Sequence, residues 1–218
     1  MGKWQAFLDF HKSTEGYISK EQDNHLIHLP DQDVLVSADL PENLAKVKEF
    51  LNYPDSGDLI IRNMKVTVGE ELRDAFIFYF DGLASRDNIG SFVLKPLMQI
   101  STAIPPNCDV RDFISQQLIT QHDVLVSENY EKAINLVCFG GCGVFIDGID
   151  RCFVADTKGW DRRGLSKPTT EGAIVGPQEG FNELIRTNTA LLRKTIKDPN
   201  FEIENMEAGR KSKTPCAV

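Results

Sequence analysis

Strand-like and helix-like segments alternate along this 218-residue chain, and this alternation limits the folds that it can adopt. The hydrophobic periodicity predicts strands at 58–67, 74–80 and 123–127, and a last strand at 201–207. It predicts helices from Pro41 to Asn52, from Ser85 or Asp87 to about Ile100, at 109–119 and at 129–137. The chain is therefore expected to be a mixed α/β (α+β) protein.

An Asp-Gly pair marks the turn of a predicted hairpin. Asp147-Gly148 separates the apolar runs 142–146 and 149–155, and Asp-Gly favours two-residue turns in which both positions need a positive φ. Phe80-Asp81-Gly82-Leu83 has the same pattern as Ile146-Asp147-Gly148-Ile149, which is consistent with a repeated strand–turn unit in two lobes. Asp-Gly is also a common strand terminator, so both readings stay open.

A segment near the C-terminal end carries the signals of a helix start, an apolar face and a helix stop. Gly176 is the predicted N-cap, with Pro177 at the first helical position, and Asp198-Pro199 ends the helix. The apolar face is predicted to comprise Phe181, Leu184, Ile185, Leu191, Leu192 and Ile196. Asn188 falls within this face, so we expect its amide to have specific hydrogen-bond partners. The backbone amides after Gly176 are a candidate anion site.

The composition is that of an ordinary soluble globular protein, with 41% hydrophobic and 26% charged residues. The net charge of −8 argues against a nucleic-acid partner, which would need a basic face. No apolar run approaches the roughly 20 residues that cross a bilayer. Residues Met1 to Lys20 lack the apolar centre of a cleavable signal.

The five cysteines do not form the pattern of a disulfide framework, because their number is odd and their spacing loose. A reducing compartment is therefore expected. Cys138, Cys142 and Cys152 lack a fourth ligand and a nearby histidine for zinc, so they are interpreted as small core residues. No metal and no cofactor are expected.

The sequence contains little that indicates catalysis. It has neither a phosphate-binding loop nor a nucleophile elbow, and His122-Asp123 is interpreted as a surface pair. Asp81, Asp147 and Glu171 could pair as acids in a cleft, but nothing in the sequence brings them together. We assign no catalytic residue and expect that the chain is not an enzyme; a hydrolase using Asp81 or Glu171 is a minor alternative.

A series of residues near the C-terminal end resembles the GerA family, the A subunits of spore germination receptors. The residues that carry the resemblance are Pro168, Glu171, Gly176-Pro177, Glu179-Gly180-Phe181, Asn188, Leu192-Arg193 and Asp198-Pro199. Four other positions depart from the family pattern in charge, namely Lys167, Val175, Gln178 and Lys194. Basic contacts to a ligand at the start of this helix are therefore reduced in this chain.

The resemblance extends upstream and covers roughly residues 38–218. Its other motifs are DLIIR at 58–62, AFIFYFDGL at 75–83, NIGSFVLKPLM at 88–98, GVFIDG at 143–148 with Arg162-Arg163 after it, and 209–214. We accordingly predict an N-terminal extension at 1–37, a first α/β lobe at 38–156, and a linker plus part of a second lobe at 157–218.

The resemblance implies a two-lobed soluble domain that is similar to substrate-binding proteins of transport systems. It implies that the chain is a piece of a membrane receptor that acts with B and C subunits in the spore inner membrane and responds to amino acids, sugars or ions. The domain would sense or relay binding of such a germinant and trigger germination. The alternative is a scaffold that self-associates or assembles the receptor without binding a small molecule.

A ligand site between lobes would appear as a polar cleft lined by residues 81–88 and 168–193. The residues predicted to bind are Arg62, Asp81, Glu171, Gly176 and Asn188. Each also has a structural interpretation: Asn188 could hold a loop carbonyl, Glu171 could cap a turn, and Arg62 could pair with an exposed acid.

Overall fold

A five-stranded antiparallel sheet forms the centre of the structure, a computed structural model that describes residues 34–99, 104–105, 108–159 and 180–218. Across the sheet the order is β1 (Leu59–Val68), β2 (Glu71–Phe80), β4 (Cys142–Ile146), β5 (Cys152–Ala155) and β3 (Val124–Ser127). The predicted strands at 58–67, 74–80 and 123–127 are confirmed within a few residues.

The longest hairpin joins β1 to β2 with a two-residue turn. Val68 pairs with Glu71, and Gly69 between them has a φ of 64°. A positive φ at the first turn position is the requirement of a type II′ turn, whose twist matches that of the flanking strands. The pairing continues to Leu59 and Phe80, which places the end of β2 beside the start of β1.

The predicted hairpin at Asp147-Gly148 is present, but its turn differs from the prediction. Gly148 has a φ of 76°, whereas Asp147 is not among the described residues with positive φ. Strand pairing runs only from Cys142–Ala155 to Val144–Phe153, so the connection is longer than two residues. The side chain of Arg73 donates to the Asp147 carbonyl and helps to hold this loop.

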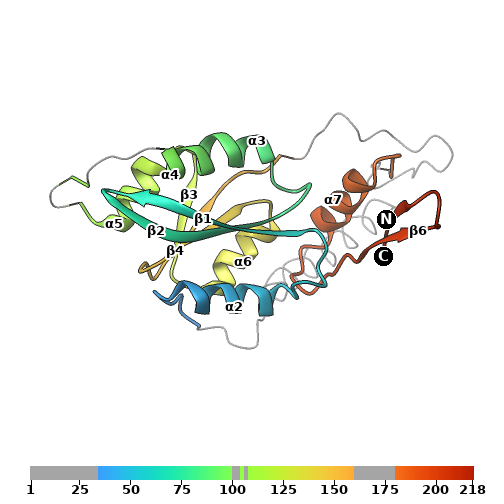
Figure 1. Ribbon diagram of the computed structural model, residues 1–218, viewed down its shortest axis with the longest axis horizontal. Coiled ribbons are helices and arrows are strands. Elements are labelled where there is room, and N and C mark those ends of the chain that lie inside the picture. Colours follow the sequence, from blue (N-terminus) through green and yellow to red (C-terminus); the bar gives the residue numbers. More distant parts are fainter. Residues whose placement is uncertain (1–33, 100–103, 106–107, 160–179) are drawn as a thin grey trace, which may run out of the picture. The chain divides into compact units, whose positions relative to one another are not determined.

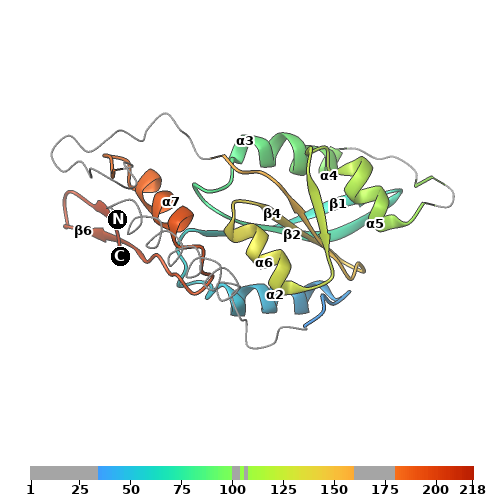
Figure 2. The same ribbon diagram turned by 180° about the vertical axis from the view of Figure 1, so that it is seen from behind.

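Helices cover both faces of the sheet (Figures 1 and 2). On one face lie α3 (Arg86–Asn88), η1 (Ile89–Leu94), α4 (Lys95–Gln99), α5 (Val110–Phe113) and η2 (Ile114–Leu118). On the other face lie α2 (Leu40–Phe50) and α6 (Tyr130–Cys138). The helices predicted at 41–52, 85–100, 109–119 and 129–137 are confirmed where the chain is described.

A proline explains why the helix after β2 contains a π-helical segment. Pro96 has no N–H to bond to the carbonyl of Phe92, and the Lys95 N–H bonds to Gly90, five residues back. The Phe92 carbonyl instead accepts a bond from the Thr120 N–H at 3.1 Å. The helix is thereby linked to the segment that follows η2.

The two faces of the sheet bury different side chains. The face under α3 to α5 is mainly aliphatic, with Val66, Ile77 and Val144 at its centre. The opposite face is aromatic: the rings of Phe76 and Phe145 stack with centroids 5.1 Å apart. Cys138, Cys142 and Cys152 are buried in these layers, which confirms that they are core residues.

The C-terminal part differs from the prediction in two respects. Helix α7 (Ile185–Thr195) begins later than Gly176, because residues 180–184 are not helical. The strand predicted at 201–207 is present only from Asn205, as β6 (Asn205–Ala208), which pairs with β7 (Thr214–Ala217) in a separate two-stranded sheet. The Asn188 side chain explains the late start. Its Oδ1 accepts from the Asn182 N–H at 2.8 Å and its Nδ2 donates to the Asn182 carbonyl at 2.7 Å, so that this backbone cannot join the helix.

The predicted apolar face of this helix is only partly buried. Phe181 and Leu184 are 64% and 65% exposed, and Leu192 and Ile196 also reach solvent. The buried positions are Thr189 and Arg193 instead. The mixed α+β class is confirmed, while the division into an extension at 1–37 and lobes at 38–156 and 157–218 stays a prediction.

Candidate functional site

A cleft of about 310 Å³ lies between the turn that follows β2 and one face of α7. Figure 1 shows α7 beside the end of the sheet where this turn lies. The cleft is lined from the turn side by residues between Asp81 and Asp87 and by Gly159, and from the helix side by residues between Arg186 and Lys194. The predicted polar cleft of residues 81–88 and 168–193 is thus present in those parts that the structure describes.

The turn after β2 is shaped by a glycine and by hydrogen bonds to the β5 side of the sheet. Gly82 has a φ of 89°, and the Leu83 N–H bonds back to the Phe80 carbonyl. The Ser85 N–H donates to the Thr157 carbonyl at 2.7 Å, and its Oγ accepts from the Asn88 N–H as the N-cap of α3. The cleft wall is therefore fixed by main-chain contacts.

Helix α7 comes very close to this turn at Gly82. A Cβ atom at Gly82 would lie 2.8 Å from the Cβ of Ala190 and 3.3 Å from the Arg186 carbonyl. Gly159 is equally close to the turn, since a Cβ there would lie 2.3 Å from the Cβ of Ser85. Two glycines thus allow backbone segments to pack closely around the cleft.

A buried ion pair fixes the C-terminal half of α7 to the start of β1. The Arg193 guanidinium donates to both carboxylate oxygens of Asp58, at 3.0 and 2.8 Å, and both side chains are almost fully buried. The guanidinium lies over the rings of Phe80 and Phe201, 4.2 and 4.9 Å from their centroids. This set of contacts positions the helix that forms one wall of the cleft.

Charged side chains from both walls converge on Asp81. Its carboxylate is only 8% exposed and accepts from Arg86 Nε at 3.0 Å and Nη2 at 2.8 Å. Arg186 on α7 approaches the same carboxylate, with its Nε 3.4 Å from Oδ2. Asp81 therefore joins an arginine of the sheet side to an arginine of α7.

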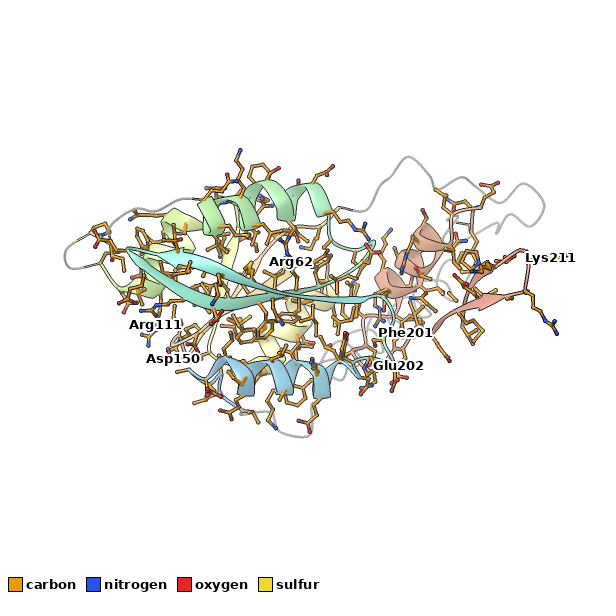
Figure 3. The ribbon with its side chains drawn as sticks, viewed as in Figure 1. Arg62, Arg111, Asp150, Phe201, Glu202 and Lys211 are labelled. Atoms are coloured by element: carbon orange, nitrogen blue, oxygen red, sulfur yellow. The ribbon has the colours of Figure 1, made fainter. Side chains whose placement is uncertain are left out.

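The electrostatic effect of this cluster extends to Tyr79. Burial raises the pKa of the Tyr79 hydroxyl; the charge of Arg86 lowers this pKa, and Asp81 raises it. Arg62 also lowers the Tyr79 pKa, so Arg62 lies within electrostatic range of the same hydroxyl. Figure 3 shows Arg62 on β1, and it is not one of the cleft-lining residues.

Of the five predicted binding residues, Asp81 lines the cleft. Asn188 does not: its amide holds the Asn182 backbone, as in its structural interpretation. Glu171 and Gly176 lie outside the described residues, and so does the predicted anion site at the helix start. The assignment of ligand-binding roles to these residues stays a prediction.

The cationic partners of the cleft were not predicted from the sequence. Arg86 follows the Asp81-Gly82 turn, and this position next to a short helix start could have indicated a pairing within the segment. Arg186 comes from α7, and no local pattern predicts that it approaches Asp81. Of the three acids considered for pairing in a cleft, Asp81 and Asp147 lie apart, because the Asp147 N–H donates to the Asp74 carbonyl near the other end of β2. Glu171 lies outside the described residues.

The remaining features offer less for a ligand. A hollow of about 540 Å³ beside α2 is lined by three acids, Asp39, Asp74 and Asp147, and by no cation. Figure 3 shows Arg111 and Asp150 next to each other, and their 2.7 Å ion pair is exposed. Within the described ranges, no three His, Cys, Asp or Glu side chains lie so that they could hold a metal ion together. None of the described helices is long and apolar enough to cross a membrane.

Comparisons with known proteins point to one family. A family model described as "Bacillus/Clostridium GerA spore germination protein" matches residues 45–218. The chain is 28% identical to spore germination protein KA of Bacillus subtilis over 188 residues, which cover 86% of this chain and 34% of that protein. It is 32% identical to spore germination protein B1 of the same species, over 84% of this chain and 36% of the relative.

A solved structure is also similar. It is the crystal structure of the N-terminal domain of the A subunit of the Bacillus megaterium spore germinant receptor GerK3, with a TM-score of 0.64 and 27% identity. The match covers 84% of this chain and 65% of that chain. The present chain thus spans about a third of the length of these two germination proteins and about two thirds of the solved domain.

Proposed function

Because the chain belongs to the GerA family of spore germination proteins, we propose that it serves as the N-terminal domain of a germinant receptor A subunit and that its cleft senses or relays a nutrient germinant. The observation that carries this proposal is the charged cleft between the β2–α3 turn and α7. Small-molecule sites are concave and combine apolar walls with a few convergent polar groups. This cleft has such walls, with Leu191 and Ala190 beside the charged cluster.

Relay of binding follows from the way in which α7 is held. One end of the helix is fixed by the Arg193–Asp58 pair, while Arg186 near the other end meets Asp81 at 3.4 Å on the cleft surface. A ligand that contacts both walls would favour one placement of α7 over another. Such a ligand shifts the equilibrium between conformations by its difference in affinity for them. The assembly with B and C subunits in the spore inner membrane, which would receive this change, is part of the proposal.

A scaffold role is the alternative, and one observation favours it. Phe181, Leu184, Leu192 and Ile196 expose apolar side chains on and just before α7. Apolar side chains gathered on one element are typical of interfaces between proteins. In that case the domain would assemble receptor subunits through α7, and the cleft would stay without a small-molecule ligand.

Two neighbouring residues of α7 allow one experiment to separate the roles. Leu191 lines the cleft, whereas Leu192 is 36% exposed and is not one of the cleft-lining residues. We expect Leu191→Trp to fill the cleft and to abolish or strongly slow nutrient-triggered germination of spores that carry the gene with its receptor partners. Leu192→Trp is the matched control and should leave the response intact.

The measurement is the loss of optical density after nutrient addition, with immunoblots for receptor level and a receptor-independent trigger as controls. Normal germination of Leu191→Trp spores contradicts a sensing or relay role for the cleft. A response that is lost in Leu192→Trp but kept in Leu191→Trp supports the scaffold.

A further inference from the structure

The charged side chains of the cleft indicate which ligands it can hold. Its lining residues include one arginine from each wall, Arg86 and Arg186, and two acids, Asp81 and Asp87. Asp81 is buried and already accepts two hydrogen bonds from Arg86. Its remaining capacity to accept hydrogen bonds faces Arg186. The buried acid is thus already engaged by the arginines of the protein itself.

The two arginines have donors left over. Arg86 uses Nε and Nη2 on Asp81, so its Nη1 group can still donate. Arg186 approaches Asp81 through Nε, so both of its terminal nitrogens can still donate hydrogen bonds to a ligand. Their side chains are 68% and 48% exposed, so a ligand can reach them from the cleft.

We propose, on the basis of the function proposed above, that the cleft binds a small organic molecule through a carboxylate or phosphate group held between Arg86 and Arg186. The guanidinium is a planar fork whose geometry matches these two groups, and charge-assisted hydrogen bonds of this kind are the stronger ones. Asp81 acts as a positioning residue, because it fixes the direction of both guanidinium groups before a ligand arrives.

The size of the cleft and its apolar walls limit the size and polarity of the part of the ligand that carries the anionic group. A volume of about 310 Å³ is at the lower end of the range for ligand sites, which favours a molecule with few atoms. Ala84, Ala190 and Leu191 give the walls beside the arginines a small apolar surface. A short apolar body attached to the anionic group fits these walls.

The test uses the purified 218-residue chain and pairs of probes with and without an anionic group. Propionate is compared with propionamide, and glycerol 3-phosphate with glycerol, by thermal shift and by ligand-observed NMR. We expect the carboxylate and phosphate probes to raise the melting temperature and the uncharged partners to have no effect. The shift should fall at high salt, because the interaction is electrostatic.

Variants locate the site. Arg186→Gln should weaken binding of the anionic probes by about tenfold or more, because a charge-assisted hydrogen bond is lost. Arg186→Lys, which keeps the charge but not the fork, should lie between Arg186→Gln and the unchanged chain. Arg73→Gln is the control, since Arg73 pairs with Glu71 near the other end of β2 and should bind like the unchanged chain.

Equal responses to the charged and uncharged partners, unchanged affinity in Arg186→Gln, or no response to any anionic probe overturns the proposal. Binding of an uncharged probe that is lost in Leu191→Trp but kept in Arg186→Gln overturns the ligand class alone and leaves the sensing role. No binding by any probe, together with normal germination of Leu191→Trp spores, overturns both.

Discussion

At the scale of single residues, Arg193 shows how much one buried charge can determine. Its side chain is 0% exposed, and the carboxylate of Asp58 that neutralises it is 2% exposed. A buried ion pair contributes little to stability compared with an apolar pair of the same size, but loss of one partner leaves the other without compensation. Arg193 and Asp58 therefore depend on each other.

We expect Arg193→Met to lower the free energy of unfolding by about 3–5 kcal/mol, because Asp58 then stays buried without a counter-charge. Urea denaturation followed by circular dichroism measures the change. The double variant Asp58→Leu with Arg193→Met removes both charges and should recover part of the loss. A double variant whose destabilisation equals the sum of the two single ones would show that the two charges are not coupled.

Arg193 also shows what can and cannot be predicted from a single residue. The sequence places Arg193 on the predicted helix, next to the apolar residue Leu192. Its burial under the ring of Phe201 depends on how the chain turns back after the helix, which no local pattern predicts. Asp81 could be singled out because Asp-Gly marks a strand end. Its partner Arg86 lies within the same segment and could have been inferred from the turn and the helix start. Arg186 could not, because the approach of an exposed arginine to an acid that is distant in sequence has no local signature.

At the scale of elements, the contact between α7 and the β2–α3 turn depends on Gly82. Its φ of 89° belongs to the left-handed region, and its missing side chain leaves room for Ala190. Gly90, in the π-helical segment that follows, has nothing within 4 Å of the position of a Cβ. Substitution by alanine is therefore expected to have opposite effects on stability at these two positions.

Gly82→Ala should lower the free energy of unfolding by about 1–3 kcal/mol and loosen α7, because it combines backbone strain with a clash. Gly90→Ala should be neutral or stabilising by about 0.4–1 kcal/mol. Thermal unfolding gives both values, and hydrogen exchange of residues 185–195 should speed up only in Gly82→Ala. Similar exchange in both variants would mean that Gly82 does not control how α7 packs.

The elements themselves were largely predictable because each depends on local signals. Strand spacing, the proline at the start of α2 and the N-caps Ser85 and Asp109 all act within a few residues. The start of α7 was misplaced because the amide of Asn188 bonds to the Asn182 backbone and competes with helix formation. The π-helical segment η1 was not predicted, since it depends on Pro96 and on the Phe92 carbonyl, which bonds to a distant residue, Thr120.

At the scale of the whole molecule, the two layers of core around the sheet hold three thiols. Burial raises the pKa of Cys138 from the ordinary 9.0 to about 12, and it raises the pKa values of Cys142 and Cys152 further. Below the ordinary thiol pKa, the three groups are protonated in both the folded and the unfolded chain. As the pH rises through 9.0, the unfolded chain loses its thiol protons first, so the folded state loses stability.

We expect the free energy of unfolding to fall by about 4 kcal/mol between roughly pH 8 and pH 10 as a result of these three thiols. Urea denaturation under reducing conditions at a series of pH values measures the fall. Cys138→Ala should reduce this fall by about a third, whatever its effect on stability at neutral pH. A fall of the same size in Cys138→Ala and in the unchanged chain would mean that Cys138 titrates normally in the folded protein.

The strand order of the sheet also has a consequence for the folding kinetics. β1 pairs with β2 across a two-residue turn, and β4 pairs with β5 across a short loop, so both hairpins can form early. The two hairpins are joined only when β2 meets β4, at Ala75 and Ile146, and the chain between them must first close as a long loop. Contacts of such high sequence separation slow folding, so the rate-limiting step should be the joining of two preformed hairpins across the centre of the sheet.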